Sequence, residues 1–308
     1  MSALEEQETA PTQSPALEDL STRRRMLAAL RHDPLAIAGA IILLLLVVLG
    51  IAGPLIAPQG PNDVDVAHML QGPSGHHWFG TDELGRDVLS RVVLAARVSL
   101  EVAVVSVGLA LALGLVIGLV AGYYRGWVDS VLMRCMDVLF AFPVLLLAVA
   151  IVAVLGPGLV TAMVAIGVVY APIFARVTRA SVLSVREQVY VTAAISTGSS
   201  DARVMRVHIL PNIAAPLIVQ TSLSLAFAIL SEAALSFLGL GVQPPQPSWG
   251  RMLYDGRGFM PQAWWLGVFP GAAIFLTVLA FNLVGDALRD VLDPRQLTMS
   301  EARRSEPR

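Results

Sequence analysis

The chain has 308 residues, of which 56% are hydrophobic and only 14% are charged, and its formal net charge is −2. Soluble globular proteins carry about 25% charged residues, so this composition excludes an ordinary soluble domain and indicates that a lipid bilayer is the solvent. The mean hydropathy of +0.69 supports the same conclusion.

Apolar stretches with few or no charged residues recur along the chain. About 20 apolar residues cross the hydrocarbon core of a bilayer as a helix, so each stretch is long enough for a transmembrane helix. The predicted spans are Leu35–Ile56, Val102–Tyr124, Val138–Gly158, Leu159–Ala175, Ile209–Ser231 and Ala263–Gly285. We therefore expect an all-α, polytopic membrane helical bundle with six transmembrane helices.

The first 34 residues are expected to form a tail. Residues 1–22 combine five acidic residues with Pro, Ser, Thr and Gln, a composition that cannot form a hydrophobic core. The apolar run that follows is longer than the roughly 7 to 15 residues usual for the core of a signal peptide. Residues 35–57 are therefore predicted to remain as a membrane anchor.

The distribution of arginine sets the predicted orientation, since the chain contains no lysine. With the N-terminus in the cytosol, sixteen arginines fall on the cytosolic side and five on the outside, namely Arg86, Arg91, Arg97, Arg251 and Arg257. Positively charged residues favour the cytosolic loops of membrane proteins. Both terminal segments, residues 1–34 and 289–308, are therefore predicted to be cytosolic.

Residues 58–97 are predicted to form an outside loop followed by an interfacial helix. The loop is rich in Pro, Gly and His. Thr81 or Asp82 can cap a helix, after which apolar residues from Val88 to Ala96 recur at helical spacing. This helix is expected to lead into the second span.

Residues 98–288 contain the five remaining predicted transmembrane helices. Within the first of these helices, Gly114, Gly118 and Gly122 are spaced by four residues. Such a face of small residues allows another helix to approach closely, and we expect intramolecular or heteromeric packing.

No metal site is expected. His68, His76 and His77 lie in the outside loop without the carboxylate or cysteine spacing of a metal site, so surface positions are favoured. Cys135 is the single cysteine, and a small apolar filler is its expected role.

The energy source for transport is expected to lie outside this chain. An ion-coupled transporter needs ionisable groups near the bilayer centre, and the central parts of the predicted spans have none. Charged residues near the span ends are explained by capping and solvation, with Glu232 the expected exception. The chain also lacks a G-x-x-x-x-G-K-[ST] loop, and no catalytic residue can be assembled, so a partner ATPase is indicated.

The predicted cytosolic loop, residues 176–208, offers a handle for such a partner. Ala193 and Ala194 expose little bulk on a short helix, and Gly198 permits a sharp turn. Ser199 or Ser200 can cap a second helix, after which Pro211 can begin the fifth span. The predicted outside loop, residues 239–262, contains too many prolines for regular structure and is expected to form a rigid docking surface.

The cytosolic loop resembles the coupling motif of bacterial ATP-binding-cassette (ABC) importer permeases, a Glu-Ala-Ala triplet followed by Gly and later by His-x-Leu-Pro. The matching residues here are Thr192-Ala193-Ala194, Gly198 and His208-Ile209-Leu210-Pro211. Thr192 replaces the acidic residue, so no salt bridge to the ATPase is expected from this position. The resemblance implies that the ATPase-coupling residues are Thr192, Ala193, Ala194, Gly198, Asp201, His208 and Pro211.

Three further stretches resemble the C-type permeases of the dipeptide, oligopeptide and nickel importer family. They are Phe79–Arg91, Ala234–Pro245 and Asn282–Arg295, and the whole resemblance spans residues 24–295. It implies a type I ABC importer permease in the bacterial cytoplasmic membrane, in which residues 98–288 form a transport core of five transmembrane helices. It also implies a second permease, two ATPase subunits or domains that bind ATP and Mg²⁺, and an extracytoplasmic binding protein.

The resemblance also directs attention to the outside surface, where Asp82, Arg86, Asp87 and Trp249 are expected to form or support the surface that receives the binding protein. Dipeptides or oligopeptides are the expected substrates. Import of nickel or another small solute, and a passive channel or structural subunit, remain alternatives, although a channel has no need of a docking helix in the cytosolic loop. Membrane lipid is an expected partner and nucleic acid is not.

Overall fold

The computed structural model describes residues 33–292, whose regular secondary structure is helical apart from an isolated β-bridge between Thr81 and Asp87. The α-helices are α2 (Pro34–Ile56), α3 (Val88–Tyr124), α4 (Gly126–Phe140), α5 (Val144–Leu155), α6 (Leu159–Arg186), α7 (Val189–Ser196), α8 (Asp201–Arg203), α9 (Ala214–Phe237), α10 (Trp249–Gly256) and α11 (Trp265–Leu292). A 3-10 helix, η1 (Val66–His68), precedes α3, and a π-helix, η2 (Val204–Ile209), and a 3-10 helix, η3 (Leu210–Ile213), join α8 to α9. The predicted terminal tails lie almost entirely outside the described residues.

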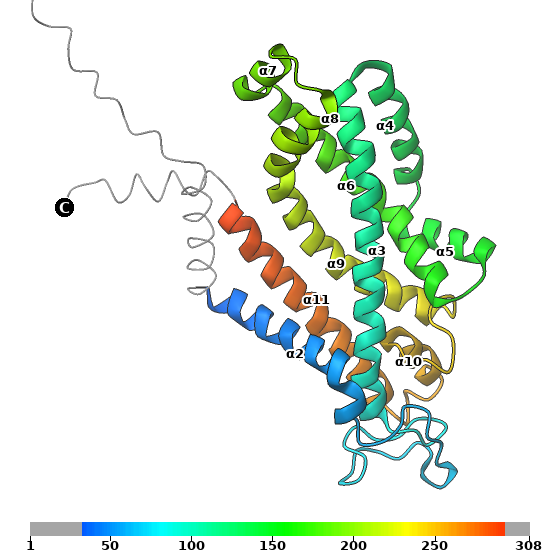
Figure 1. Cartoon of the computed structure of the whole chain (residues 1–308). Coiled ribbons are helices and arrows are strands. Elements are labelled where there is room, and N and C mark those ends of the chain that lie inside the picture. Colours follow the sequence, from blue (N-terminus) through cyan, green and yellow to red (C-terminus); the bar gives the residue numbers. More distant parts are fainter. Residues whose placement is uncertain (1–32, 293–308) are drawn as a thin grey trace, which may run out of the picture.

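Helix α3 runs along the length of the bundle (Figure 1). It packs most extensively against α6 and also contacts α2 and α9, while α11 packs against both α2 and α9. The short helix α7 lies at one end of the bundle, named here the α7 end. Helix α10 and residues 58–87 lie at the opposite end, named here the α10 end (Figure 1).

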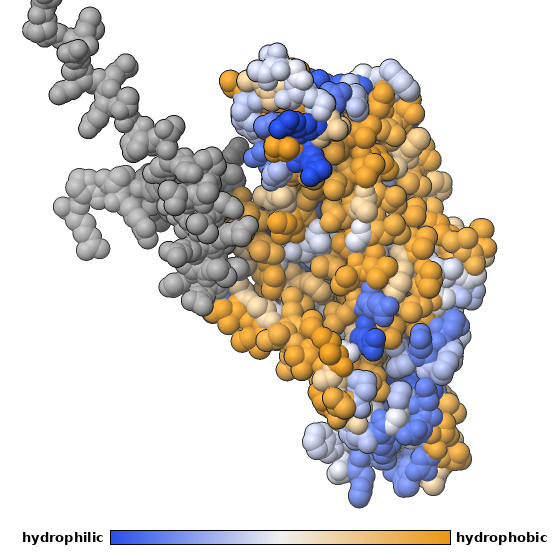
Figure 2. All heavy atoms as spheres, in the orientation of Figure 1, coloured by the Kyte–Doolittle hydropathy of each residue, from blue (hydrophilic) through white to orange (hydrophobic). Residues whose placement is uncertain are grey.

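The bundle has the surface of a membrane protein. Five helices are long and apolar enough to span a membrane, or six if the bent pair α4 and α5 forms one span. Figure 2 shows a broad apolar surface with polar residues concentrated toward the two ends. Large apolar side chains such as Leu44, Val104 and Phe275 are at least half exposed, which lipid or a partner helix tolerates and water does not. The predicted all-α membrane bundle is confirmed.

The third predicted span, Val138–Gly158, is wrong as a single straight helix. Helices α4 and α5 are bent by 90° at a short break. Pro143 lies at this break as the residue before α5. Its ring removes a backbone N–H donor and disfavours the helical conformation for Phe142, so the chain turns there.

Two predicted loops are shorter or more regular than expected. Helix α6 continues to Arg186, so the predicted loop 176–208 begins later. Arg176 and Arg179 do not end this helix because both find acidic partners on α4. In the predicted irregular loop 239–262, Ser248 caps α10 by accepting a hydrogen bond from the backbone N of Arg251 at 3.1 Å.

The fifth span begins earlier than predicted. The helical path starts with α8 at Asp201 and continues through η2 and η3 to α9, instead of starting at Ile209 or Pro211. Pro211 is accommodated in the first turn of η3, where a missing N–H donor costs little. Ser200 precedes α8, but its side chain makes no capping hydrogen bond.

Helix α3 is continuous where a separate interfacial helix and second span were predicted. Its cap is Asp87, whose Oδ2 accepts a hydrogen bond from the backbone N of Ser90 at 2.8 Å. Thr81 serves the preceding loop instead, where its Oγ1 accepts from the backbone N of Gln71 at 2.8 Å. The cap therefore lies several residues beyond the predicted positions.

The glycine stripe brings α3 close to α6. A Cβ added at Gly118 would lie 2.6 Å from the Cβ of Thr178, and one at Gly122 would lie 2.8 Å from the Cβ of Val182. Gly114 faces the same helix, opposite Phe174. In a bilayer, helix association depends on such close van der Waals packing rather than on apolar burial from water. The stripe is thus used within the chain.

Candidate functional site

Helix α7 forms an exposed handle at the α7 end. Only Val191 is buried within this helix, while Thr192 and Ala193 are exposed and Ala194 is half-buried. The Thr192 Oγ1 donates a hydrogen bond to the backbone O of Val189 at 2.9 Å. This hydroxyl is therefore used by its own helix. The exposed surface of α7 combines the small side chain of Ala193 with the larger apolar side chains of Val189, Tyr190 and Ile195.

Gly198 ends α7 in a conformation that suits glycine. Its φ is +82°, and its N–H donates to the backbone O of Ile195 at 3.0 Å while the N–H of Ser199 donates to the backbone O of Ala194 at 3.1 Å. This pair of bonds is the Schellman helix end. A Cβ at Gly198 would meet no atom within 4 Å, so the backbone conformation, and not lack of space, favours glycine.

The segment after α7 is tied to the bundle by polar and ring contacts. The hydroxyl of Tyr123 at the end of α3 donates a hydrogen bond to Asp201 Oδ1 at 2.7 Å. The ring of His208 lies 6.4 Å from the ring of Tyr190, measured between centroids. Pro211 is exposed. Asp201 and His208 thus make contacts within the chain. The other predicted coupling residues are exposed, apart from the half-buried Ala194.

Beside the handle, ion pairs join α4 to α6. Arg179 Nε and Nη2 donate to Asp129 Oδ1 and Oδ2 at 2.5 and 2.6 Å, and Arg176 Nη2 lies 2.8 Å from Asp137 Oδ1. Paired hydrogen bonds between a guanidinium and a carboxylate are among the stronger polar contacts in proteins. They fix α4 on α6 near the end of the bundle.

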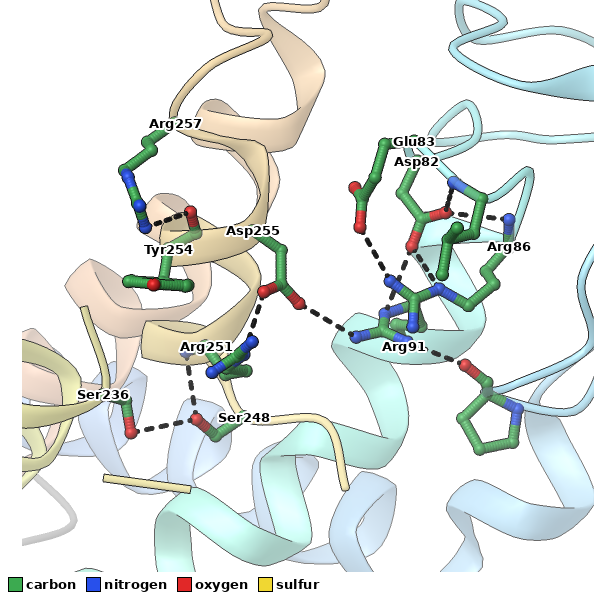
Figure 3. A network of polar contacts seen from close by, with 12 residues as sticks. Asp82, Glu83, Arg86, Arg91, Ser236, Ser248, Arg251, Tyr254, Asp255 and Arg257 are labelled. Carbon is green, nitrogen blue, oxygen red and sulfur yellow. Dashed lines mark hydrogen bonds and ion pairs between the residues drawn. The ribbon is translucent and has the colours of Figure 1, made fainter. Parts of the chain in front are cut away.

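A second polar cluster lies at the α10 end (Figure 3). Asp82 Oδ2 accepts from Arg86 Nε at 2.6 Å, and Arg91 lies between two carboxylates, 3.6 Å from Asp82 and 3.9 Å from Asp255. Arg251 also pairs with Asp255 at 2.8 Å. These contacts connect the 58–87 loop, α3 and α10. Loss of one partner would leave a buried charge without compensation, so the cluster holds these three segments together.

Glu83 lies at the edge of this cluster. Its Oε1 accepts a hydrogen bond from Arg86 Nη2 at 3.0 Å, whereas its Oε2 is buried and finds no partner among residues 33–292. Burial raises the pKa of the Glu83 carboxyl above its usual value, and the negative charge of Asp82 adds to the effect. The ionised form is therefore disfavoured in the folded chain.

The four predicted outer-surface residues, Asp82, Arg86, Asp87 and Trp249, are all buried, with exposures of 5%, 9%, 2% and 1%. Asp87 Oδ1 lies 3.1 Å from Nδ1 of His77, which is also buried, so the predicted surface position of His77 is wrong. Trp249 Nε1 donates to the backbone O of Val92 at 3.0 Å. These side chains order the outer loops, and a role in receiving a partner through that support stays a prediction.

Glu232 is fully buried in α9 and points toward α3. Its Oε1 accepts a hydrogen bond from Ser236 Oγ at 2.8 Å, and its Oε2 accepts one from Ser99 Oγ at 3.4 Å. Helix capping and solvation therefore do not explain the position of this carboxyl. This agrees with the expectation that Glu232 is the exception among the charged residues near the span ends. Ser236, four residues later on the same helix face, was the available sequence signal for its partner.

The remaining polar candidates are dispersed. Within residues 33–292, no three His, Cys, Asp or Glu side chains are arranged to hold a metal ion. His68 pairs with Asp65 at 2.6 Å. Cys135 is exposed on α4, so the prediction of a core filler is wrong for this chain taken alone.

Sequence reasoning missed the residues that connect segments, including Tyr123, Arg91 and Asp255. Each contacts a residue far away along the chain or on another element. No spacing rule within a single helix or loop relates such partners. Asp201, at the start of α8, was named from the sequence, but its partner Tyr123 was not.

Comparisons with known proteins match nearly the whole chain. The model for "binding-protein-dependent transport system inner membrane component" matches residues 114–298, and that for the "N-terminal TM domain of oligopeptide transport permease C" matches residues 21–73. The dipeptide transport system permease protein DppC of Alkalihalophilus pseudofirmus is 46% identical over 93% of this chain and 96% of its own length. The glutathione transport system permease protein GsiD of Escherichia coli O6:K15:H31 is 47% identical over 86% of this chain and 88% of its own.

A solved structure shares the fold. A chain of the inward-facing MetNI methionine ABC transporter superposes with a TM-score of 0.55 at 18% identity, covering 66% of this chain and 96% of that chain. At this identity the likeness concerns the fold alone, which is the type I arrangement expected from the sequence.

Proposed function

Because this chain belongs to the family of binding-protein-dependent transport system inner membrane components, the permease subunits of ABC importers, we propose that it forms one half of a peptide translocation pathway. A second, homologous permease completes the pathway. Two ATPase subunits or domains bind ATP and Mg²⁺ and hydrolyse ATP, while this chain contributes no catalytic group. An extracytoplasmic binding protein delivers the substrate.

The observation that carries the proposal is the exposed α7 handle. A short helix with the small residues Ala193 and Ala194, ended by Gly198 in a left-handed conformation, projects from one end of the bundle. A small-faced helix can enter a groove on a partner without steric conflict. A passive channel offers no reason for such a handle.

Peptides are favoured as substrates by the relatives. DppC is named as a dipeptide permease and GsiD as a glutathione permease, and both match this chain over most of its length. Glutathione is itself a tripeptide, so the two names share one chemical class. Import of nickel or another small solute remains the second candidate.

The proposed orientation places the α7 end in the cytosol and the α10 end outside. It rests on the sixteen-to-five distribution of arginines along the sequence. The handle then faces the ATPases, and the buried cluster around Asp82 and Asp255 supports the surface that receives the binding protein.

The test is to purify the complex in mild detergent, identify its subunits by mass spectrometry and measure ATP hydrolysis with the binding protein present. We expect a second permease and ATPase subunits or domains to co-purify, and dipeptides or short oligopeptides to stimulate hydrolysis. Free amino acids and Ni²⁺ are the comparison ligands in the same hydrolysis assay. Stimulation by Ni²⁺ alone would replace peptide by metal as substrate, and a purified chain without any ATPase would contradict the importer assembly.

A further inference from the structure

Both ends of the segment that carries α7 and α8 are attached to the C-terminal end of α3, one through its last turn and the other through its C-cap residue. At the start of the segment, Arg125 Nη2 donates to Glu187 Oε1 at 2.9 Å. At its end, the Tyr123 hydroxyl donates to Asp201 Oδ1 at 2.7 Å. Tyr123, in the last turn of α3, and Arg125, the C-cap residue of this helix, thus hold the two sides of the handle.

We propose that Tyr123 and Arg125 form a clamp that passes movement of the handle into α3. This rests on the proposed function, in which a partner ATPase displaces α7. Tyr123 and Arg125 are positioning residues, because neither is expected to touch the ATPase or the substrate. We name the two contacts together the α3 clamp.

The Tyr123 side of the clamp is the stronger one. Tyr123 is only 4% exposed, and Arg186 at the end of α6 lies over its ring at 5.2 Å from the centroid. A phenol donating to a carboxylate is a charge-assisted hydrogen bond, which is stronger than a neutral one. The ring is thereby held between the last turn of α6 and the first residue of α8.

The Arg125 side is more exposed, with side-chain exposures of 41% for Arg125 and 71% for Glu187. An ion pair in this setting is screened by solvent and contributes little by itself. Arg125 nevertheless holds a φ of +56° at the junction of α3 and α4, a conformation that non-glycine residues seldom adopt. Arg125 therefore forms the turn between α3 and α4 with its backbone and contacts Glu187 with its side chain.

Helix α3 is suited to carry movement to the other end of the bundle. It is a single helix of 37 residues, about 55 Å long at 1.5 Å per residue, and its glycine stripe packs it tightly on α6. At its far end, Asp87 binds His77 and Arg91 lies between Asp82 and Asp255. Displacement of the handle therefore reaches the outer loops and α10 through one rigid element.

The experiment compares Tyr123→Phe with Tyr124→Phe in the complete complex reconstituted in liposomes with its ATPases, binding protein and a dipeptide. Tyr123→Phe keeps the ring and removes only the hydroxyl that binds Asp201. Tyr124 is half exposed and its hydroxyl has no hydrogen bond within residues 33–292, so Tyr124→Phe is the matched control. The measured quantities are ATPase content, ATP hydrolysis and dipeptide taken up per ATP hydrolysed.

We expect Tyr123→Phe to retain the ATPase but to lower the dipeptide imported per ATP by about tenfold, the lower end of the scale for one hydrogen bond to a charged group. Tyr124→Phe should match the wild-type ratio. A purely structural role would lower the amount of complex without changing this ratio. An unchanged ratio in Tyr123→Phe would overturn the clamp, whereas a wild-type complex without ATPase would overturn the proposed function itself.

Two further measurements keep the test decisive if Tyr123→Phe inserts poorly. Asp201→Ala removes the same hydrogen bond from its exposed partner, and the double variant should lower the ratio no further than Asp201→Ala alone, because both changes break one contact. Glu187→Arg should lower the ratio less, and Arg125→Glu combined with Glu187→Arg should restore it. Additive losses in the double variant would contradict the clamp. A normal ratio in Asp201→Ala, together with no recovery by the charge exchange, would also contradict it.

Discussion

A methyl group at Gly118 should force α3 away from α6. Its Cβ would lie 2.6 Å from the Cβ of Thr178 and 3.0 Å from the backbone N of Arg179, and it would also meet the backbone O of Ala175. Two of these three atoms belong to the backbone and cannot rotate aside. Overpacking of this kind costs about 1 to 3 kcal/mol.

Gly108→Ala provides the control in the same helix. No atom lies within 4 Å of a Cβ at Gly108, so this change brings only the gain in helix propensity of about 1 kcal/mol, which Gly118→Ala shares. The difference between the two variants therefore isolates the packing of α3 on α6. It should appear as a difference of about 2 to 10 °C in apparent Tm, with Gly118→Ala the lower.

The assay is thermal unfolding of each purified variant in the same mild detergent, followed by loss of helical circular dichroism or by aggregation. Gly118→Val should melt lower still, because its added methyl groups meet the same backbone. Equal melting of Gly118→Ala and Gly108→Ala would refute the conclusion that the glycine stripe sets the approach of α3 to α6.

Three further predictions follow from the outer cluster and the proposed topology. Asp87→Ala removes the cap of α3 and should lower the free energy of unfolding by about 1 kcal/mol or more, whereas Asp65→Ala, which affects an exposed 3-10 turn, should have a smaller effect in the same melting assay. Because the pKa of Glu83 is raised by burial, the protein loses stability as the pH rises through that pKa, so Glu83→Gln should raise the apparent Tm at pH 8 and have little effect near pH 4; a larger gain at the acidic pH would contradict this assignment. With Cys135 replaced by Ser, an impermeant maleimide should label Gln246→Cys in intact cells and Thr197→Cys only after permeabilisation, and the reverse pattern would invert the proposed orientation.

The membrane bundle was predictable because the length of an apolar stretch is a local property of the sequence, and this length decides whether a helix can span a bilayer. The boundaries were less predictable, since Arg176 and Arg179 looked like the start of a loop. They remain in α6 because Asp137 and Asp129 approach from α4. That partnership depends on the packing of α4 against α6, which no local sequence pattern supplies.

The handle and the outer surface show the same contrast. The position of α7 and the turn at Gly198 were recognisable because a short helix and a left-handed end are local. The burial of Asp82, Arg86, Asp87 and Trp249 was not, since charged loop residues are usually exposed. Their burial results from contacts within the 58–87 loop and from the packing of α10, far away in the sequence, against the start of α3.

The most direct test of the central claim is the effect of Ala193→Trp on the assembled complex. Ala193 is exposed on α7, whereas Ala194 is half-buried within the chain, so a large side chain at Ala193 challenges the partner contact without disturbing the permease. With Ala193→Ser as the control, we predict normal insertion of Ala193→Trp, loss of ATPase on co-purification and loss of peptide-stimulated hydrolysis. An Ala193→Trp complex that keeps its ATPase and its full stimulated hydrolysis would contradict the assignment of α7 as the coupling handle.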